Sequence, residues 1–380
     1  MNLEFGHGTS DLPDAARAGA AAARAALGAI RRHPLSCVFV FASVAYDLTE
    51  LLGAIVDAAG DGVPVIGAST AGEICDGCRE RSVVVAALAS PHLSVCAAVG
   101  ESVSKNWRRA FDDCARSPSI SRFLHDTETL SQSLRATGEK AFAIMFSPGN
   151  TRYADSHACE LVNEFNNRSG GAYPLIGGGC ADDWHMEENY VFLGRRAYRD
   201  SMLMAFCTTG LAFGMGSAHG FVPTAKPLIV SRCSGHEIFE FDGTPAIGAL
   251  SAATGFPISE LQGKHFAQTT CIPFGYATAY DEFGLSVGSY FTPAGGIRTT
   301  HCFSEGAPIT LMESRPDLLA SAGKNAVIRA LWSGGIRTPA AALMFSCALR
   351  SRIAGHTIES EIARVKIGRA SCRERVSLNV

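Results

Sequence analysis

The sequence lacks both a dominant charge and a long hydrophobic run. It holds 33 lysine and arginine residues against 36 aspartate and glutamate residues, so the formal net charge is −3. The absence of a basic block argues against nucleic acid or an anionic membrane as a partner. No apolar run reaches the roughly 18 residues that a membrane-spanning helix needs. The nearest run, 82–100, is interrupted by Pro91 and is predicted to form two strands joined by a turn.

Signals for secretion and for catalysis are also missing. Residues 1–34 begin acidic and then become Ala/Arg-rich, unlike the basic and apolar regions of a secretory leader. The 13 cysteines are odd in number and scattered through apolar stretches, so we expect reduced, buried thiols in a cytoplasmic protein. Neither a zinc-protease motif nor a haem-attachment motif is present. We predict no catalytic residue, no metal site and no enzymatic activity.

One plan is repeated along the chain. A short apolar strand is followed by an amphipathic helix and then by a second strand that runs into a glycine-rich turn. The plan is complete at 37–73 and at 141–183, and it begins again with a strand at 341–346 and a helical stretch to residue 365. This pattern predicts an α/β fold with two domains, each built from strand–helix–strand units with mixed sheets.

The expected domain organisation follows from these repeats. We predict an N-terminal helical segment over 1–34, a first domain over 35–215 and a second domain over 216–366. The segment 218–227 contains two prolines and is predicted as a loop, and 228–243 alternates with Ile229, Ile238 and Phe241 facing inward. Residues 367–380 carry three arginines but no closing turn. We expect them to be a non-native tail that replaces the native C-terminal segment after about residue 366.

The two glycine-rich turns are the candidate ligand-binding site. Such turns expose backbone N–H groups and small hydroxyls, and the acidic residues at their ends would attract an ammonium group. The alternatives are tight strand-to-loop geometry and helix capping. The candidate ligand-binding residues are Gly67, Ser69, Thr70, Glu73, Gly177, Gly178, Asp182 and Asp183.

Other chemistry-bearing residues give weaker signals. Cys75 and Cys78 form a CxxC motif without a second ligand pair, so incidental surface cysteines are favoured over a zinc or redox site. Non-covalent haem needs only one axial histidine, and His219 in its Gly/Pro-bracketed loop is the best-placed candidate. His157, His185 and His356 form the next tier. Three serines stand at strand ends and two arginines follow the third, at Ser43, Ser147, Ser346, Arg350 and Arg352.

The chain resembles the FIST proteins, a family of bacterial sensory modules with an N-terminal and a C-terminal FIST domain. The resemblance is carried by 66–74, 175–183, 219–223, 240–246 and 342–348. It implies sensing of a small ligand inside the cell, with amino acids suggested for the family. Some stand-alone members resemble haem-binding nitric-oxide sensors that regulate a histidine kinase.

These observations predict a cytoplasmic signal-transduction module that binds an amino acid or similar small ligand and signals to a partner in trans. The expected mechanism is a population shift between closure states of the two domains. The alternative is a haem-binding nitric-oxide sensor acting on a histidine kinase, with His219 as the haem ligand. A hydrolase that uses a strand-end serine is a remote alternative supported only by fold analogy.

Overall fold

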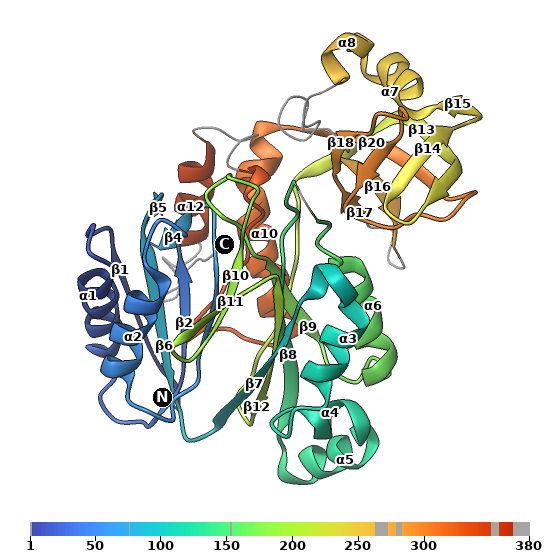
Figure 1. Cartoon of the computed structure of the whole chain (residues 1–380). Helices are drawn as coiled ribbons and strands as arrows, with labels where there is room; N and C mark the ends of the chain where they lie inside the picture. Colours follow the sequence, from blue (N-terminus) through green and yellow to red (C-terminus); the bar gives the residue numbers. More distant parts are fainter. Residues whose placement is uncertain are drawn as a thin grey trace. The chain divides into compact units, whose positions relative to one another are not determined.

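A computed structural model describes residues 2–75, 77–152, 154–262, 273–278, 283–350 and 357–367 (Figure 1). The chain divides into two compact units. Among the described residues, the first comprises those within 2–217, 324–348 and 362–367, and the second comprises those within 218–323 and 349–361. Within the described ranges, no helix combines the length and the apolar character needed to cross a membrane.

The first unit contains a six-stranded sheet with the order β1-β6-β2-β3-β10-β11. Only β2 and β3 pair in parallel, and the crossover between them is α2. The elements of this sheet are β1 (Glu4–Ser10), α1 (Ala15–Leu27), β2 (Leu35–Ala42), α2 (Leu48–Ala59), β3 (Val65–Ser69), β6 (Val83–Ala89), β10 (Tyr190–Leu193) and β11 (Arg196–Arg199). The N-terminal segment predicted as helical therefore also supplies a strand, β1, which pairs with β6.

A four-stranded sheet in the same unit has the order β7-β12-β8-β9, with β8 and β9 in parallel. Its elements are β7 (Leu93–Glu101), α3 (Val103–Ala115), α4 (Ser121–His125), α5 (Thr127–Thr137), β8 (Lys140–Ser147), α6 (Ala158–Ser169), β9 (Leu175–Gly179) and β12 (Ser201–Thr209). The hairpin β4 (Glu73–Cys75) and β5 (Gly77–Arg79) forms a separate two-stranded sheet.

The two sheets are built by the same path of the chain. In each, a first strand and helix lead to a parallel strand–helix–strand pair, and a last strand inserts between the first and second strands. The order β1-β6-β2-β3 thus corresponds to β7-β12-β8-β9. The two complete copies of the predicted repeat are confirmed. The predicted break of 82–100 into two strands is also confirmed, since β6 and β7 follow one another there.

The first unit is layered, with helices outside and sheets inside (Figure 1). One apolar core joins α1 and α2 to the six-stranded sheet, a second joins α3, α4 and α6 to the four-stranded sheet, and a third lies between the two sheets. The central strands carry apolar residues on both faces because both faces are covered. Successive side chains of a strand point to opposite faces, so alternate residues of β2 enter different cores. Val38 and Val40 face the helices, whereas Phe39 and Phe41 face the other sheet.

Local signals explain where the crossover helix α2 begins and ends. Asp47 caps its N-terminus by accepting the backbone N–H groups of Thr49 and Glu50. Leu51, Leu52, Ile55 and Val56 form its buried stripe. The helix ends at Gly60, whose φ of 92° suits glycine.

Buried thiols are distributed among these layers. Cys37 on β2 and Cys207 on β12 lie in the core between the sheets, and Cys114 on α3 lies in the core between that helix and the four-stranded sheet. Burial raises the pKa of Cys37 and of Cys114 to about 12, and it also raises the pKa of Cys180 just after β9. At neutral pH these thiols are therefore protonated.

The second unit is built around a sheet with the order β17-β16-β20-β13-β14-β19-β18, with β15 paired to β14. Helix α10 (Pro316–Ser333) begins in this unit and continues into residues of the first, and α12 (Thr357–Ile367) spans the same division. Its other elements are β13 (Phe221–Ser234), β14 (Glu237–Phe241), β15 (Thr244–Pro245), α7 (Ala246–Thr254), α8 (Ile258–Leu261), β16 (Phe274–Ala277), β17 (Phe283–Ser286), β18 (Gly288–Phe291), β19 (Ile297–Thr299) and β20 (Pro308–Ser314).

Three predictions about secondary structure and side-chain orientation are wrong. The segment 218–227 is not all loop, because β13 starts at Phe221 and tolerates Pro223 and Pro227 at a register shift against β20. Ile229 is 41% exposed rather than inward, although Ile238 and Phe241 are buried as predicted. The segment 341–346 is assigned no strand.

The residues after the third predicted strand are only partly described. The helical stretch predicted to residue 365 is α12, which ends at Ile367. Residues 368–380, which make up nearly all of the predicted non-native tail, lie outside the described residues. The same holds for Arg352 and His356.

Candidate functional site

Two glycine-rich turns follow the parallel strands β3 and β9 in the first unit. A glycine is required in each strand, because a Cβ on Gly67 would lie 1.7 Å from the Val40 carbonyl oxygen and a Cβ on Gly177 would lie 1.8 Å from that of Met145. These two clashes involve equivalent positions of the two repeats, since Gly67 pairs with Val40 and Gly177 pairs with Met145. Tight strand packing, the alternative to ligand binding, therefore accounts for these two glycines.

The two turns are hydrogen-bonded to each other. The Ala181 N–H donates to the Ser69 carbonyl oxygen at 2.9 Å, and the Ser69 hydroxyl donates to the Ala181 carbonyl oxygen at 2.6 Å. The Asp183 N–H donates to the Thr70 carbonyl oxygen at 3.2 Å. The carboxyl ends of the two parallel strand pairs thus meet, and this is the edge at which α/β sheets bind ligands.

Glu73 lies beneath this junction and is 1% exposed. Its carboxylate accepts the Thr70 hydroxyl at 2.5 Å and the Ser82 hydroxyl at 2.6 Å. Burial raises the pKa of Glu73 to about 7, and the nearby charge of Asp183 acts in the same direction. Ser82, just before β6, was not predicted as part of the site, because its partner Glu73 is nine residues earlier and no motif links them.

Asp183 lies at the half-buried surface of the junction. Its backbone adopts the left-handed conformation with a φ of 52°. The Ser43 hydroxyl donates to its Oδ2 atom at 2.6 Å, and the Ala45 N–H donates to that hydroxyl. Burial raises the pKa of the Asp183 carboxyl, whereas nearby His185 acts to lower it. Ser43, weighed from the sequence as a strand-end serine, is therefore an orienting partner of Asp183.

Asp182 has a structural role in the second turn. Its carboxylate accepts the backbone N–H groups of Met186, Glu187 and Glu188 at 2.9, 2.6 and 2.9 Å. These bonds hold a bend in which Trp184 and Met186 also have positive φ values. Asp182 therefore holds a turn through backbone N–H groups, and it does not cap a helix, because residues 186–188 are not helical.

The structure brings together five of the eight predicted ligand-binding residues: Ser69, Thr70, Glu73, Asp182 and Asp183. Gly67, Gly177 and Gly178 lie within the strands that lead to the junction. Gly178 is exposed, and a Cβ there would be 4.0 Å from the Phe345 side chain. The segment around Phe345 was predicted as a strand but is irregular. The Phe345 ring packs against the rings of Phe41 and Phe146.

The junction gathers negative charge without a matching cation. Among the described residues, no lysine or arginine side chain bonds to Glu73, Asp182 or Asp183, whose partners are hydroxyls and backbone N–H groups. Glu73 and Asp182 are enclosed by these donors. Asp183 is the carboxylate in the group that is partly accessible from outside.

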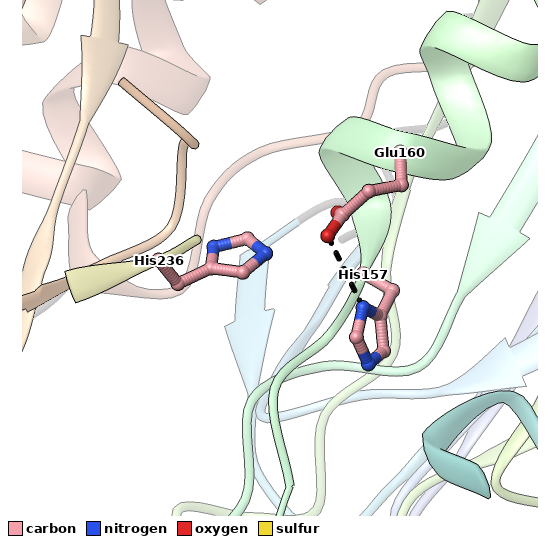
Figure 2. A group of neighbouring side chains, drawn as sticks. All are labelled: His157, Glu160 and His236. Atoms are coloured by element: carbon pink, nitrogen blue, oxygen red, sulfur yellow. Dashed lines mark hydrogen bonds and ion pairs between the residues drawn. The ribbon is translucent and has the colours of Figure 1, made fainter. Parts of the chain in front are cut away.

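A histidine–carboxylate pair lies at the start of α6. His157 Nδ1 is 3.2 Å from Glu160 Oε1, and both side chains are 22% exposed (Figure 2). His157 has a φ of 50° at the residue before the helix. The pair joins the loop before α6 to its first turn.

The geometry at His219 does not suit haem ligation. His219 Nδ1 accepts the Phe221 N–H at 3.0 Å, so the proton of a neutral ring is on Nε2, the nitrogen that would have to face the iron. The His219 carbonyl oxygen accepts Arg350, whose guanidinium also pairs with Glu361 at 2.7 Å. Arg350, one of the two arginines that follow the strand-end serine Ser346, is thus bound within the second unit. Haem binding stays a prediction.

The CxxC motif lies in a β-hairpin. Cys75 ends β4, and Cys78 pairs with Ile74 from β5. A thioredoxin-like redox pair would begin a helix, and this pair does not. Its intervening residue Asp76 lies outside the described residues.

Comparison with known proteins gives one family. No curated protein matches the chain. A solved structure described as "Cyanuric acid hydrolase: evolutionary innovation by structural concatenation" is 13% identical, with 55% of this chain and 69% of that chain covered and a TM-score of 0.28. The model of the FIST N domain matches residues 36–244. This match includes both glycine-rich turns and more than half of the chain, which therefore belongs to the FIST N family of sensory domains.

Proposed function

We propose that this protein is a sensory module that binds a small molecule with a cationic group, such as an amino acid, at the junction of the two glycine-rich turns. Membership of a sensory family supports the general role. The observation that carries the site is the cluster of three carboxylates, Glu73, Asp182 and Asp183, whose bonding partners are all neutral.

The proposed ligand class follows from the charge and burial of this cluster. A partly buried carboxylate attracts a cation more strongly than an exposed one, because less water screens the interaction. Asp183 is the half-buried member, and the Ser43 hydroxyl orients it by donating to Oδ2, so a partly exposed carboxylate faces an incoming ligand. An ammonium group bound to Asp183 would also relieve its repulsion with Glu73, which raises the pKa of Glu73.

We propose binding rather than catalysis at this site. The Ser43 hydroxyl donates to a carboxylate, not to a histidine base, and Ser69 and Ser82 donate to Ala181 and Glu73. A serine nucleophile needs a base that takes its proton. A sensory role needs only that the ligand bind one conformational state better than another.

The signalling step is proposed to pass through the turn junction to a partner protein in trans, such as a histidine kinase. The junction joins the two repeats of the first unit, so a ligand bound there contacts both. A ligand that binds one arrangement of the turns tenfold more tightly biases that arrangement by about 1.4 kcal/mol. The partner would recognise the favoured arrangement.

Calorimetric titration with the amino acids, each compared with its N-acetyl form, tests the proposal. Acetylation removes the ammonium charge, so we expect binding of at least one free amino acid and not of its acetylated form. Asp183→Asn should abolish this binding, because asparagine keeps the acceptor for Ser43 and tolerates the left-handed backbone but carries no charge. Asp113→Asn on α3 is the matched control. Equal binding by Asp183→Asn, or by the acetylated form, would contradict the site.

A further inference from the structure

The outer face of α1 carries an unusual local charge. Residues 15–46 contain four arginines and no aspartate or glutamate, although the whole chain has a net charge of −3. The arginines are all exposed: Arg17, Arg24, Arg31 and Arg32. Arg17 and Arg24 are seven residues apart, which places them on one face of the helix about 10 Å from each other.

These four arginine side chains make no hydrogen bond or ion pair with the rest of the described chain. Two acids that precede this segment bind backbone groups instead. Glu4 accepts the N–H groups of residues 31–33, and Asp14 caps α1 by accepting the N–H of Arg17. On the adjacent helix α2, Asp57 is paired with Arg195. The positive charge of α1 is therefore available to an outside partner.

The surface between the arginines is shallow and lined by small residues. Arg24, Ala25, Gly28, Ala29 and Arg31 border an open depression of about 540 Å³. Side chains no larger than a methyl group allow the backbone of a second helix to approach closely. The lining lacks the large apolar side chains that anchor a helix in a lipid surface.

The inner face of α1 is held tightly, so the outer face is a rigid platform. Ala18, Ala22 and Ala26 are fully buried. Beneath them β1 carries glycines, because a Cβ on Gly6 would lie 1.9 Å from the Ala26 carbonyl oxygen and one on Gly8 would lie 2.2 Å from that of Ala22. Binding of a partner to α1 therefore costs little conformational entropy, because the helix is already ordered.

We propose that the outer face of α1 is a docking surface for an acidic helix of a partner protein. The small residues provide the contact between the helices, and the arginines pair with carboxylates along its edges. Charge complementarity accounts for recognition, and the small-residue lining favours a helix over a lipid surface or a nucleic acid. This proposal is independent of the ligand site at the turns.

Fluorescence anisotropy with a labelled helical peptide tests the surface. The probe is an alanine-rich peptide with glutamates repeated every seven residues on one face, and its control has the same composition with glutamates around the whole helix. We expect the one-faced peptide to bind more tightly, and we expect high salt to weaken that binding. Arg24→Glu/Arg31→Glu should weaken it by about tenfold or more, since several ion-pair contacts of up to about 1 kcal/mol each are lost or become repulsive.

Two further variants separate charge from shape. Ala25→Leu leaves every charge in place but fills the depression, and it should also weaken peptide binding. Arg135→Glu in the last turn of α5 is the matched control for an exposed helical arginine, and it should leave binding unchanged. Circular dichroism melting verifies that each variant folds.

The proposal is overturned if both peptides bind equally, or if Arg24→Glu/Arg31→Glu binds the one-faced peptide as well as the wild type does. It is also overturned if phosphatidylserine vesicles or a DNA duplex bind with this arginine dependence while the peptide does not. Loss of binding in Ala25→Leu together with the charge variants supports a docked helix.

Discussion

The two repeats of the first unit share a backbone plan but use their turns differently. In the first repeat, the far edge of β3 is paired with β10, and Ser69 and Thr70 are almost fully buried. In the second, β9 pairs with β8 among the described strands, and Gly178 and Gly179 are exposed. The first turn is thus enclosed as a support, whereas the second presents Asp183 at the surface.

This difference shows how a repeat can separate structural and functional roles. The parallel strands, the crossover helix and the strand glycine are the same in both repeats, because these features are needed to pack the sheets. The residues after the strands do not take part in packing the sheets, so they can differ between the repeats. One turn places hydroxyl side chains around a buried carboxylate, and the other carries two adjacent aspartates.

Substitution of the strand glycines should give the largest effect on stability. Gly67→Ala and Gly177→Ala each place a Cβ within 2 Å of a backbone carbonyl oxygen, so we expect each to destabilise the protein by about 3 kcal/mol, the upper end of overpacking costs. Gly53→Ala on α2 is the control, since a Cβ there meets nothing within 4 Å. Urea unfolding measures all three, and tolerance of Gly177→Ala alone would break the equivalence of the two turns.

The pH dependence of stability should identify the enclosed turn. The folded protein keeps the Glu73 proton up to about pH 7, whereas the unfolded chain releases it near 4.5. The folded state therefore binds more protons between these values, and the free energy of unfolding should fall by about 2 kcal/mol from pH 5 to pH 8. The raised pKa of Asp183 acts in the same direction.

Glu73→Gln should flatten this dependence, because the amide carries no titrating proton. Asp183→Asn should remove only the smaller contribution of the more exposed carboxyl. Denaturant unfolding at a series of pH values measures both. An unchanged slope in Glu73→Gln would show that the pKa of Glu73 is not raised.

Substitution of the two strand-end serines, Ser43 and Ser147, should give the smallest effects on stability, and the two costs should differ. Ser147 aligns with Ala42 in the strand register, not with Ser43, because Ser147 pairs with Gly179 and Ala42 pairs with Ser69. Ser147→Ala restores the residue of the first repeat and should be nearly neutral. Ser43→Ala removes the hydrogen bond to Asp183 and should cost about 1 kcal/mol. Thermal unfolding would contradict this alignment if the two costs were equal.

The sequence predicted the parts of the fold that depend on local patterns. The buried strands β2 and β8, their crossover helices and the glycine-rich turns all have short-range signals. The pairing of β10 with β3 had no short-range signal, because the paired residues Val191 and Ala68 are more than a hundred positions apart in the sequence. The apolar segment at 341–346 looks like the other first strands, but a strand also needs a hydrogen-bonded neighbour, which the pattern cannot supply.

The candidate site was predicted in its composition but not in its internal roles. Acidic and hydroxyl residues in two repeated turns marked them as the candidate site, and in the structure the two turns are hydrogen-bonded to each other. The sequence did not show that Glu73 faces inward, since its partner Ser82 lies nine residues later, just before β6. It also did not show that Asp182 binds backbone while Asp183 remains accessible, because both residues are acidic and adjacent.

The buried thiols of the first unit can be used to measure how often each part of that unit opens. A protonated, enclosed thiol does not react with an alkylating reagent until its surroundings open. Three of these thiols lie in different places: Cys37 lies between the sheets, Cys114 lies on the buried face of α3, and Cys180 lies in the second turn. Their separate alkylation rates, resolved by mass spectrometry of peptides, would time the opening of each layer without any introduced label.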